Sequence, residues 1–356
     1  MVRERPVRPS LPPPAHEALN QDWPVPIVGA PLAGGPSTPA LAAAVSEAGG
    51  IGFLAAGYKT AAATQAELQE LRALTSRPIG LNLFCPTRDV VDEVALAAYA
   101  DRMRGEAQRY GVVAGEPRWT DDDWTAKLDV AAREGPDVVS FTFGCPEREI
   151  VEWLQGCGCR VWCTVTSVAE AELATSRKVD ALVVQGAEAG GHQGSFENHD
   201  QEPLPLFALL KQIASATDLP RIAAGGIADG RDISAVLAAG AVAGQIGTAL
   251  LLATEAATSP PHRAALERDA ETRLTRAFTG RRARGIVNRF LLDHDPFVPV
   301  GYPEIHYLTA PIRGAARELG DADGINLWAG TSYRRALAAS ASELVERWAR
   351  EASVRY

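Results

Sequence analysis

The chain has 356 residues, of which 46% are hydrophobic and 22% are charged, and its formal net charge is −9. This composition is typical of a folded globular protein with a substantial core and excludes a disordered chain. The excess of acidic residues argues against a nucleic-acid partner, so we expect small molecules as ligands.

The N-terminal segment, the cysteines and one long uncharged run indicate the cellular environment of the protein. Residues 1–19 are charged and proline-rich without the apolar segment of a secretory signal, so we expect an N-terminal extension there. The five cysteines lack the spacing of a zinc site or a disulfide scaffold, which predicts no metal and a reducing, cytoplasmic environment. The uncharged run 235–253 is diluted by small and polar residues, so we expect a helix end, a buried strand and a helix start instead of a membrane span.

From residue 24 onward, short apolar runs alternate with longer helical patterns, as in parallel βα units. The candidate strands are residues 25–33, 51–57, 79–84, 138–144, 160–167, 181–186, 221–226 and 241–250. Because these runs lack polar alternation, both faces of the sheet should be buried. The pattern predicts an α/β fold of the (β/α)8 TIM-barrel type, with an open doubly wound sheet as the alternative.

The intervening segments 37–50, 60–74, 167–178 and 228–240 are predicted helices. The first has Ser37 or Thr38 as N-cap, Pro39 in the first turn and Gly49 at its end. Residues 87–120 are longer than one crossover helix needs, and residues 258–324 lose the βα rhythm. We therefore expect a TIM barrel over residues 20–257 and 325–356, with a small cap domain over residues 258–324.

The active site of such a barrel lies at the C-terminal ends of the strands, and phosphate groups bind the last two loops. The seventh strand ends in Gly225 and Gly226, and the eighth ends in Gln245, Gly247 and Thr248. Either loop alone is equally well explained as a turn, but together they predict a phosphate site. The chain lacks a G-x-G-x-x-G motif with a later acidic partner, which favours FMN over a Rossmann-bound dinucleotide.

Amide side chains interrupt two apolar strands, at Asn82 and Gln185. An amide offers a donor and an acceptor, which suits the edge of an isoalloxazine ring; the alternative is bonding to neighbouring backbone. Thr142 and Thr164 are left out of the predicted site because threonine is common in strands.

The first strand ends in Pro31, Leu32 and Ala33, followed by two glycines. This backbone could form a shelf for a flat ring. The alternative is an ordinary βα loop.

The stretch VVQGAEAGGHQGSF, residues 183–196, contains the only one of six histidines at a predicted strand end. Gly190 and Gly191 precede His192, so the histidine has no bulky neighbours in sequence to pack against. Near a flavin it could accept a proton from a substrate carbon or, when protonated, hold an anionic substrate. Glu188 is a competing acid or base, with surface solvation as its other role.

These stretches together resemble the nitronate monooxygenase family, formerly called 2-nitropropane dioxygenases. The resemblance rests on GAPLAGGPSTPALAAAVSEAGGIGFL, GLNLF, VVQGAEAGGHQGSF, AAGGIADGRDI, GQIGTALLLATEA, YPEIHYLTAPIR and LWAGTSYRRA, and it covers most of the chain. It implies an FMN-dependent barrel enzyme, without a metal, that oxidises alkyl nitronates with O2 to a carbonyl compound and nitrite. Nitroalkane detoxification is the corresponding role.

The resemblance also implies site residues. Its FMN contacts fall on Pro31, Leu32, Ala33, Asn82, Gln185, Gly190, Gly191, Gly225, Gly226, Gln245, Gly247 and Thr248. The active-site histidine falls on His192, as base or as anion binder. Cap arginines Arg281, Arg282 and Arg284 are candidates for drawing in anionic substrates, with plain solvation as the alternative.

The sequence is also compatible with two other functions. An NAD(P)H-dependent flavin reductase of the enoyl- or quinone-reductase type would share the GGH and GGI motifs and reduce an acceptor. A barrel that only binds a phosphate-bearing ligand, as a sensor or storage protein, would catalyse nothing. Acceptance of neutral nitroalkanes and assembly as a homodimer are also left open.

Overall fold

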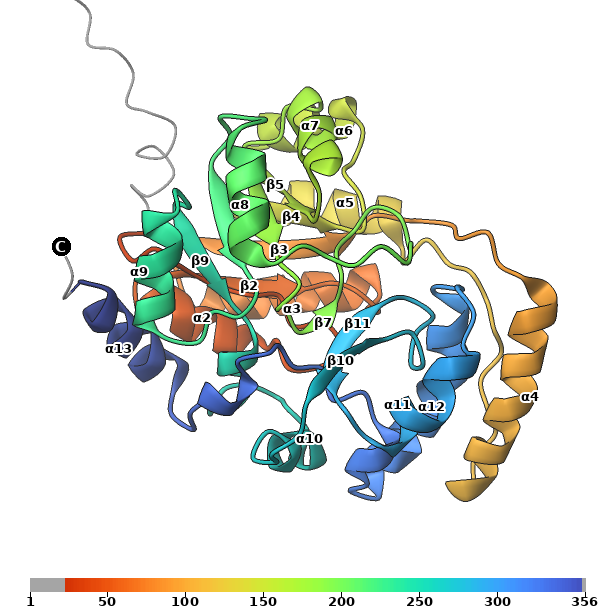
Figure 1. The fold of residues 1–356 in the computed structure, drawn as a ribbon. Helices are drawn as coiled ribbons and strands as arrows, with labels where there is room; N and C mark the ends of the chain where they lie inside the picture. Colours follow the sequence, from red (N-terminus) through yellow and green to blue (C-terminus); the bar gives the residue numbers. More distant parts are fainter. Residues whose placement is uncertain (1–22, 354–356) are drawn as a thin grey trace, which may run out of the picture.

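The computed structural model describes residues 23–353, so the predicted N-terminal extension lies outside the described residues. Eight parallel strands close into a barrel in the order β1-β2-β3-β4-β5-β6-β8-β9, which confirms the predicted TIM barrel (Figure 1). The barrel strands are β1 (Ile27–Gly29), β2 (Ile51–Ala55), β3 (Ile79–Phe84), β4 (Val138–Thr142), β5 (Arg160–Val165), β6 (Ala181–Gln185), β8 (Arg221–Ala224) and β9 (Ala243–Ile246).

Helices cover the outside of the barrel, with N-caps that the sequence indicates. Thr38 begins the first of them, since its Oγ1 accepts a hydrogen bond from the Leu41 amide at 2.9 Å, and Pro39 follows in the first turn. The barrel helices are α2 (Pro39–Glu47), α3 (Ala61–Leu74), α5 (Trp124–Glu134), α6 (Arg148–Gly156), α7 (Val168–Ser176), α8 (Leu206–Ala214), α9 (Gly230–Ala238) and α13 (Ala341–Ser353).

The uncharged run 235–253 divides as predicted into the end of α9, strand β9 and a short 3-10 turn at Thr248–Leu250. No helix within residues 23–353 combines the length and apolarity needed to cross a bilayer.

The core has two layers because every barrel strand is buried on both faces. Inside the barrel, Phe53, Trp162 and Val183 are almost fully buried. Trp23, just before β1, meets the Trp162 ring edge-to-face with centroids 5.9 Å apart, and so fills the interior near the strand N-termini. The opposite end of the barrel remains for a site.

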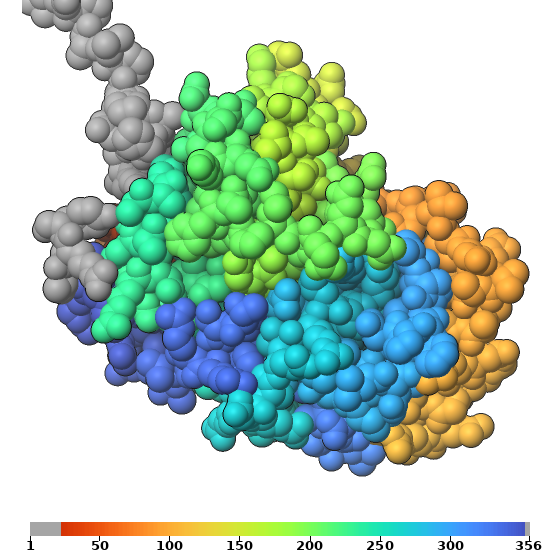
Figure 2. All heavy atoms as spheres, viewed as in Figure 1, coloured from red at the N-terminus to blue at the C-terminus, as the bar shows by residue number. Residues whose placement is uncertain are grey.

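The cap follows β9 and contains a small sheet and several helices. Its elements are α10 (Pro260–Ala265), β10 (Thr272–Thr275), β11 (Ala283–Ile286), α11 (Arg289–His294) and α12 (Glu304–Glu318). Helix α4 (Glu93–Arg109), from the long segment 87–120, packs beside α12 (Figure 1), and the two regions form one continuous surface (Figure 2). The long segment thus serves the cap, and the exact domain division stays a prediction.

A partly buried ion pair ties α4 to α11. Two guanidinium nitrogens of Arg289 lie 2.8 Å from the two carboxylate oxygens of Glu106. Burial alone raises the pKa of Glu106, but the nearby His294 ring, 3.7 Å away, and the two hydrogen bonds from Arg289 outweigh it and lower the pKa to about 2.

The glycine-rich stretch after β6 differs from the loop expected from the sequence. Gly191–His192 forms a short strand, β7, that pairs antiparallel with β11 and completes the sheet β10-β11-β7. His192 is opposite Ala283, and Gly191 is opposite Arg284. The histidine backbone therefore belongs to the sheet of the cap.

Candidate active site

All of the site residues predicted from the sequence line one cavity of about 390 Å3 at the C-terminal ends of the barrel strands. They are Pro31, Leu32, Ala33, Asn82, Gln185, Gly190, Gly191, His192, Gly225, Gly226, Gln245, Gly247 and Thr248. Their shared location follows from the closed barrel, which brings the ends of parallel strands together.

The loop after β1 forms one wall and is folded back on itself. The Leu32 amide donates to Ser37 Oγ at 2.7 Å, and the Ser37 amide donates to the Leu32 carbonyl at 3.2 Å. A Cβ at Gly247 would lie 3.3 Å from the side chains of Ala30 and Leu32. The absence of a side chain there lets the loops after β1 and β9 approach each other.

Two glycine loops leave backbone donors free beside the cavity. Gly225 and Gly226 have φ values of +112° and +73°, which favour glycine. Within the described chain, the amides of these two glycines and of Gly247 and Thr248 donate to no protein acceptor. Free amides converging on a cavity are suited to an anion.

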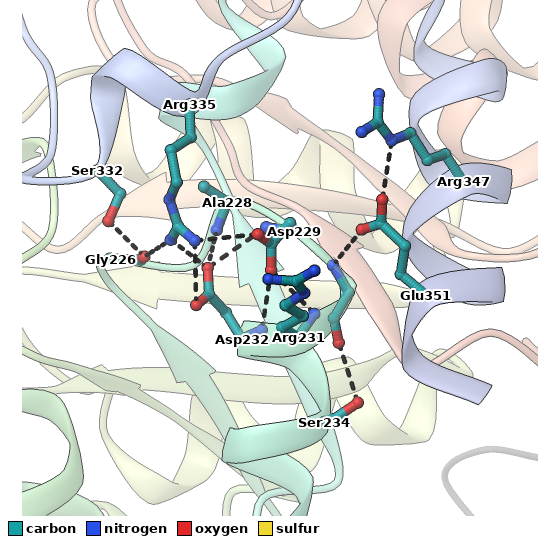
Figure 3. A network of polar contacts seen from close by, with 11 residues as sticks. Gly226, Ala228, Asp229, Arg231, Asp232, Ser234, Ser332, Arg335, Arg347 and Glu351 are labelled. Atoms are coloured by element: carbon teal, nitrogen blue, oxygen red, sulfur yellow. Dashed lines mark hydrogen bonds and ion pairs between the residues drawn. The ribbon is translucent and has the colours of Figure 1, made fainter. Parts of the chain in front are cut away.

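The N-terminus of α9, by contrast, is already occupied by carboxylates (Figure 3). Asp229 caps the helix, and the Asp232 carboxylate accepts from the Ala228 amide at 2.8 Å. The Glu351 carboxylate, from α13, accepts from the Gly230 amide at 3.0 Å. Any anion bound here must therefore use the glycine loops.

The closing segment before α13 holds the Gly226 loop in place (Figure 3). Ser332 Oγ donates to the Gly226 carbonyl at 2.8 Å. Arg335 also donates to this carbonyl, at 3.3 Å, and forms ion pairs with Asp229 and Asp232. The LWAGTSYRRA stretch thus acts as a brace for the predicted phosphate loop.

Gln185 bonds to the backbone of the histidine segment, which was the alternative to a cofactor contact. Its Nε2 donates to the His192 carbonyl at 3.1 Å, and its Oε1 accepts from the Gly194 amide at 2.7 Å. Each end of the amide has one further bonding position, because an amide nitrogen has two hydrogens and the oxygen two lone pairs. Gln185 can hold the histidine segment and contact a ligand at once.

Asn82 is oriented by hydroxyl groups on the neighbouring strand. Its Nδ2 donates to Ser140 Oγ at 2.9 Å and to Thr142 Oγ1 at 3.0 Å. Its Oδ1 accepts no hydrogen bond from the described residues. Thr142 and Thr164 both line the cavity, although the sequence reasoning excluded them.

His192 lies among aromatic rings. The rings of Phe143, Tyr302 and Trp328 meet it edge-to-face, with centroids 5.7, 5.8 and 5.5 Å away. Burial, with a smaller contribution from nearby cationic arginines, lowers the pKa of His192 to about 3. The imidazole is therefore neutral near pH 7, which favours a base over a protonated anion binder.

Two aromatic residues near the histidine have unusual backbone conformations that the sequence did not reveal. Phe143 and Tyr58 have φ values of +71° and +67°, although neither is glycine. Strained residues of this kind often occur at functional sites. Tyr302 connects the two, since its ring packs on Phe143 and its hydroxyl donates to the Tyr58 hydroxyl at 3.1 Å.

The candidate arginines are not free on the surface. Arg281 is 1% exposed, and its guanidinium lies 4.1 Å from the centre of the Phe143 ring. Arg282 pairs with Glu202, and Arg284 donates to a backbone carbonyl at 2.9 Å. Arg282 thus holds the cap against the segment after β7, and Arg284 holds it against the segment between β6 and β7.

Glu188 is likewise structural. Its carboxylate accepts from the Leu206 amide at 3.0 Å, at the start of α8. Within residues 23–353, no group of three or more histidine, cysteine or acidic side chains is placed to hold a metal ion.

Fold and site together define a TIM-barrel enzyme whose cavity lies between the strand ends and a cap that carries a neutral histidine. The family model for nitronate monooxygenase matches residues 18–351. The chain belongs to the nitronate monooxygenase family, a family of flavin-dependent oxidoreductases.

Similar proteins support this membership. A nitronate monooxygenase from Pseudomonas aeruginosa is 39% identical over 332 residues, which cover 90% of this chain and 94% of that protein. The solved nitroalkane oxidase from Streptomyces ansochromogenes is 47% identical with a TM-score of 0.92, over 95% of this chain and 98% of that chain. FabK from Thermotoga maritima is 25% identical with a TM-score of 0.72, over 95% and 96% of the two chains.

Proposed function

We propose that this enzyme binds FMN and oxidises alkyl nitronates with O2 to a carbonyl compound and nitrite. The observation that carries the proposal is the cavity at the strand ends, with free backbone amides in two of its loops and the neutral His192 in its wall. Family membership supplies the reaction class. The likeness to a nitroalkane oxidase extends the proposal to neutral nitroalkanes as substrates.

The polar and apolar groups that line the cavity fit the phosphate and the ring of FMN. The free amides of the two glycine loops provide donors for a phosphate, and the Leu32 backbone provides a flat wall for the ring. The unpaired Asn82 Oδ1 is an acceptor for a ring N–H, and Gln185 has bonding positions left. When bound, FMN supplies the redox chemistry of the reaction.

The protein side chains would accept the substrate proton and stabilise the negative charge of the substrate. A neutral His192 can accept the proton of the carbon that bears a nitro group. Arg281 and Arg313 are 1% and 6% exposed, and among the described residues they bond only to neutral groups. Both arginines lie near enough to His192 to lower its pKa, and their positive charge would favour the negative charge that appears on the nitro group.

The primary test is direct. The flavin released by denaturing purified enzyme is identified by chromatography, and nitrite is measured during aerobic turnover of an alkyl nitronate and a neutral nitroalkane. Released FMN with catalytic nitrite formation supports the proposal. A flavin-loaded enzyme that forms no nitrite from either substrate contradicts it.

The second candidate is the NAD(P)H-dependent flavin reductase that the GGH and GGI motifs leave open. Anaerobic mixing distinguishes the two functions. The holoenzyme is mixed with NADH or NADPH and, separately, with an alkyl nitronate, while the flavin absorbance is followed. Rapid bleaching by a nicotinamide without any response to the nitronate indicates the reductase, and a flavin that responds to no donor indicates a ligand-binding protein.

A homodimer and a cytoplasmic location complete the proposal. Light scattering coupled to size exclusion measures the mass in solution against the 37.8 kDa of one chain. Fractionation of the producing cells tests the location.

A further inference from the structure

One contact of His192 is not explained by the cavity itself. Its Nε2 lies 2.9 Å from Thr279 Oγ1, on the turn between β10 and β11. Thr279 is 2% exposed, and it is not among the described residues that line the cavity. Nε2 is therefore directed to the cap.

The turn that carries Thr279 is held on both sides. The Phe278 carbonyl accepts from Thr309 Oγ1 of α12 at 2.5 Å, and the Gly280 carbonyl accepts from Asn198 Nδ2 at 2.8 Å. With both flanking carbonyls anchored, the Thr279 hydroxyl has a fixed position relative to the imidazole ring.

The Thr279 hydroxyl has two acceptors within reach but only one hydrogen. Besides His192 Nε2, the Arg281 carbonyl lies 3.2 Å from Thr279 Oγ1, and the Arg281 amide lies 3.5 Å from the same oxygen. If Thr279 donates to the imidazole, this carbonyl has no donor among the described residues. If the imidazole carries its proton on Nε2 and donates to Thr279, the threonine hydrogen serves the carbonyl.

The second arrangement makes one more hydrogen bond than the first. A buried carbonyl without a donor is unfavourable, so the second arrangement should dominate. In a neutral imidazole only one nitrogen carries hydrogen, and a proton on Nε2 leaves the Nδ1 lone pair free. Nδ1 has no hydrogen-bond partner in the described part of the chain.

We propose that Thr279 fixes His192 in the Nε2–H tautomer and thereby makes Nδ1 the base for neutral nitroalkanes. This inference rests on the proposed function. In the step, the substrate C–H bond breaks, its proton forms an N–H bond on Nδ1, and the electron pair remains on the substrate as the nitronate. No electron leaves the substrate at this point, and Thr279 acts as a positioning residue through His192.

The tautomer can be observed without any turnover. Holoenzyme labelled with 15N-histidine is examined by NMR, where protonated and unprotonated ring nitrogens have well-separated shifts, and the His192→Asn variant assigns the signal. We expect a protonated Nε2 and an unprotonated Nδ1 in the unmodified enzyme. The opposite assignment overturns the proposal, even if the enzyme never oxidises a nitronate.

Variants of Thr279 connect the tautomer to catalysis. Thr279→Val should lower the ratio of kcat/KM for a neutral nitroalkane to that for its preformed nitronate at least tenfold, because only the nitroalkane needs the base. Thr279→Ser should restore both this ratio and the NMR signature. If Thr279→Val keeps the kcat/KM ratio and the histidine 15N spectrum of the unmodified enzyme, the proposed role of Thr279 is wrong.

The matched control is Thr275→Val. Thr275 is also a buried cap threonine, but its hydroxyl donates to Asp295 Oδ1 at 2.5 Å and does not reach the histidine. It should leave the ratio and the His192 tautomer unchanged. If Thr279→Val does not fold, the 15N spectrum of the unmodified enzyme still tests the proposal, because it shows which ring nitrogen of His192 carries the proton.

Discussion

His192 and Ala283 are paired directly across β7 and β11, so the proposed base is built into a sheet of the cap while the proposed flavin cradle belongs to the barrel. Gln185 is the link between them, because it ends barrel strand β6 and bonds to the His192 carbonyl at 3.1 Å. The position of the cap therefore sets where the base stands relative to a ring bound on the barrel.

Replacing the proposed base should separate chemistry from cofactor binding. In His192→Asn we expect turnover of a neutral nitroalkane to fall about 100-fold or more, the usual contribution of a general base. FMN content should be retained, because the free amides lie in the two glycine loops. Steady-state rates and the flavin-to-protein absorbance ratio measure both quantities, and complete loss of FMN would indicate a structural role instead.

A methyl group at Gly190 should disturb the cradle. Its Cβ would lie 2.4 Å from the Gly330 amide nitrogen, a backbone atom that cannot turn away. Displacing that amide breaks its 3.0 Å hydrogen bond to Thr248 Oγ1, so Gly190→Ala should be purified with little FMN. Gly314→Ala is the control, because its Cβ would meet nothing within 4 Å, and equal flavin content in both variants would contradict the cradle.

The partly buried ion pair between α4 and α11 should matter for stability. Glu106→Gln removes the partner that bonds both guanidinium nitrogens of Arg289 and leaves only Asp293, 3.2 Å away on the same helix, so we expect the free energy of unfolding to fall by about 1–2 kcal/mol. Urea denaturation followed by fluorescence measures the change. Glu152→Gln, in an exposed pair with Arg148, should have little effect, and a similar small effect in Glu106→Gln would show that α4 docks by apolar contacts alone.

Acid should destabilise the protein through three histidines whose pKa is lowered by the removal of water around them. Burial lowers the pKa of His192 to about 3 and that of His262 to about 4, against an unperturbed value of 6.5. Burial also lowers the pKa of His306 well below 6.5. The unfolded chain then binds more protons, so the contribution to stability is complete above pH 6.5 and is lost as pH falls toward the folded pKa values.

Urea denaturation midpoints measured between pH 7.5 and pH 4.5 test whether stability falls on acidification. We expect the midpoint to fall with pH, and the fall to be less steep in His262→Gln. His199→Gln, at an exposed position, should leave the slope unchanged. A midpoint that rises on acidification would contradict the burial of these imidazoles.

The fold was predictable because its strands are apolar on both faces and most of them are followed closely by glycine. The cavity lining followed from the same pattern, since strand ends meet in any closed barrel. Thr142 and Thr164 were excluded because a threonine that lines a cavity and one that fills a strand look alike in sequence.

Long-range contacts account for what the sequence did not reveal. Nothing near Thr279 in the chain indicates that it meets His192, 87 positions earlier. Likewise, the Gly230 amide is satisfied by Glu351, 121 positions later, which no local pattern indicates.

The contact between Gly230 and Glu351 also has a consequence for biosynthesis. Helix α13 leaves the ribosome after every barrel strand, so the loop after β8 is incomplete while the rest of the barrel can already pair. Binding of a phosphate-bearing cofactor at that loop is thus expected to be a late event in maturation, after α13 has packed against α9.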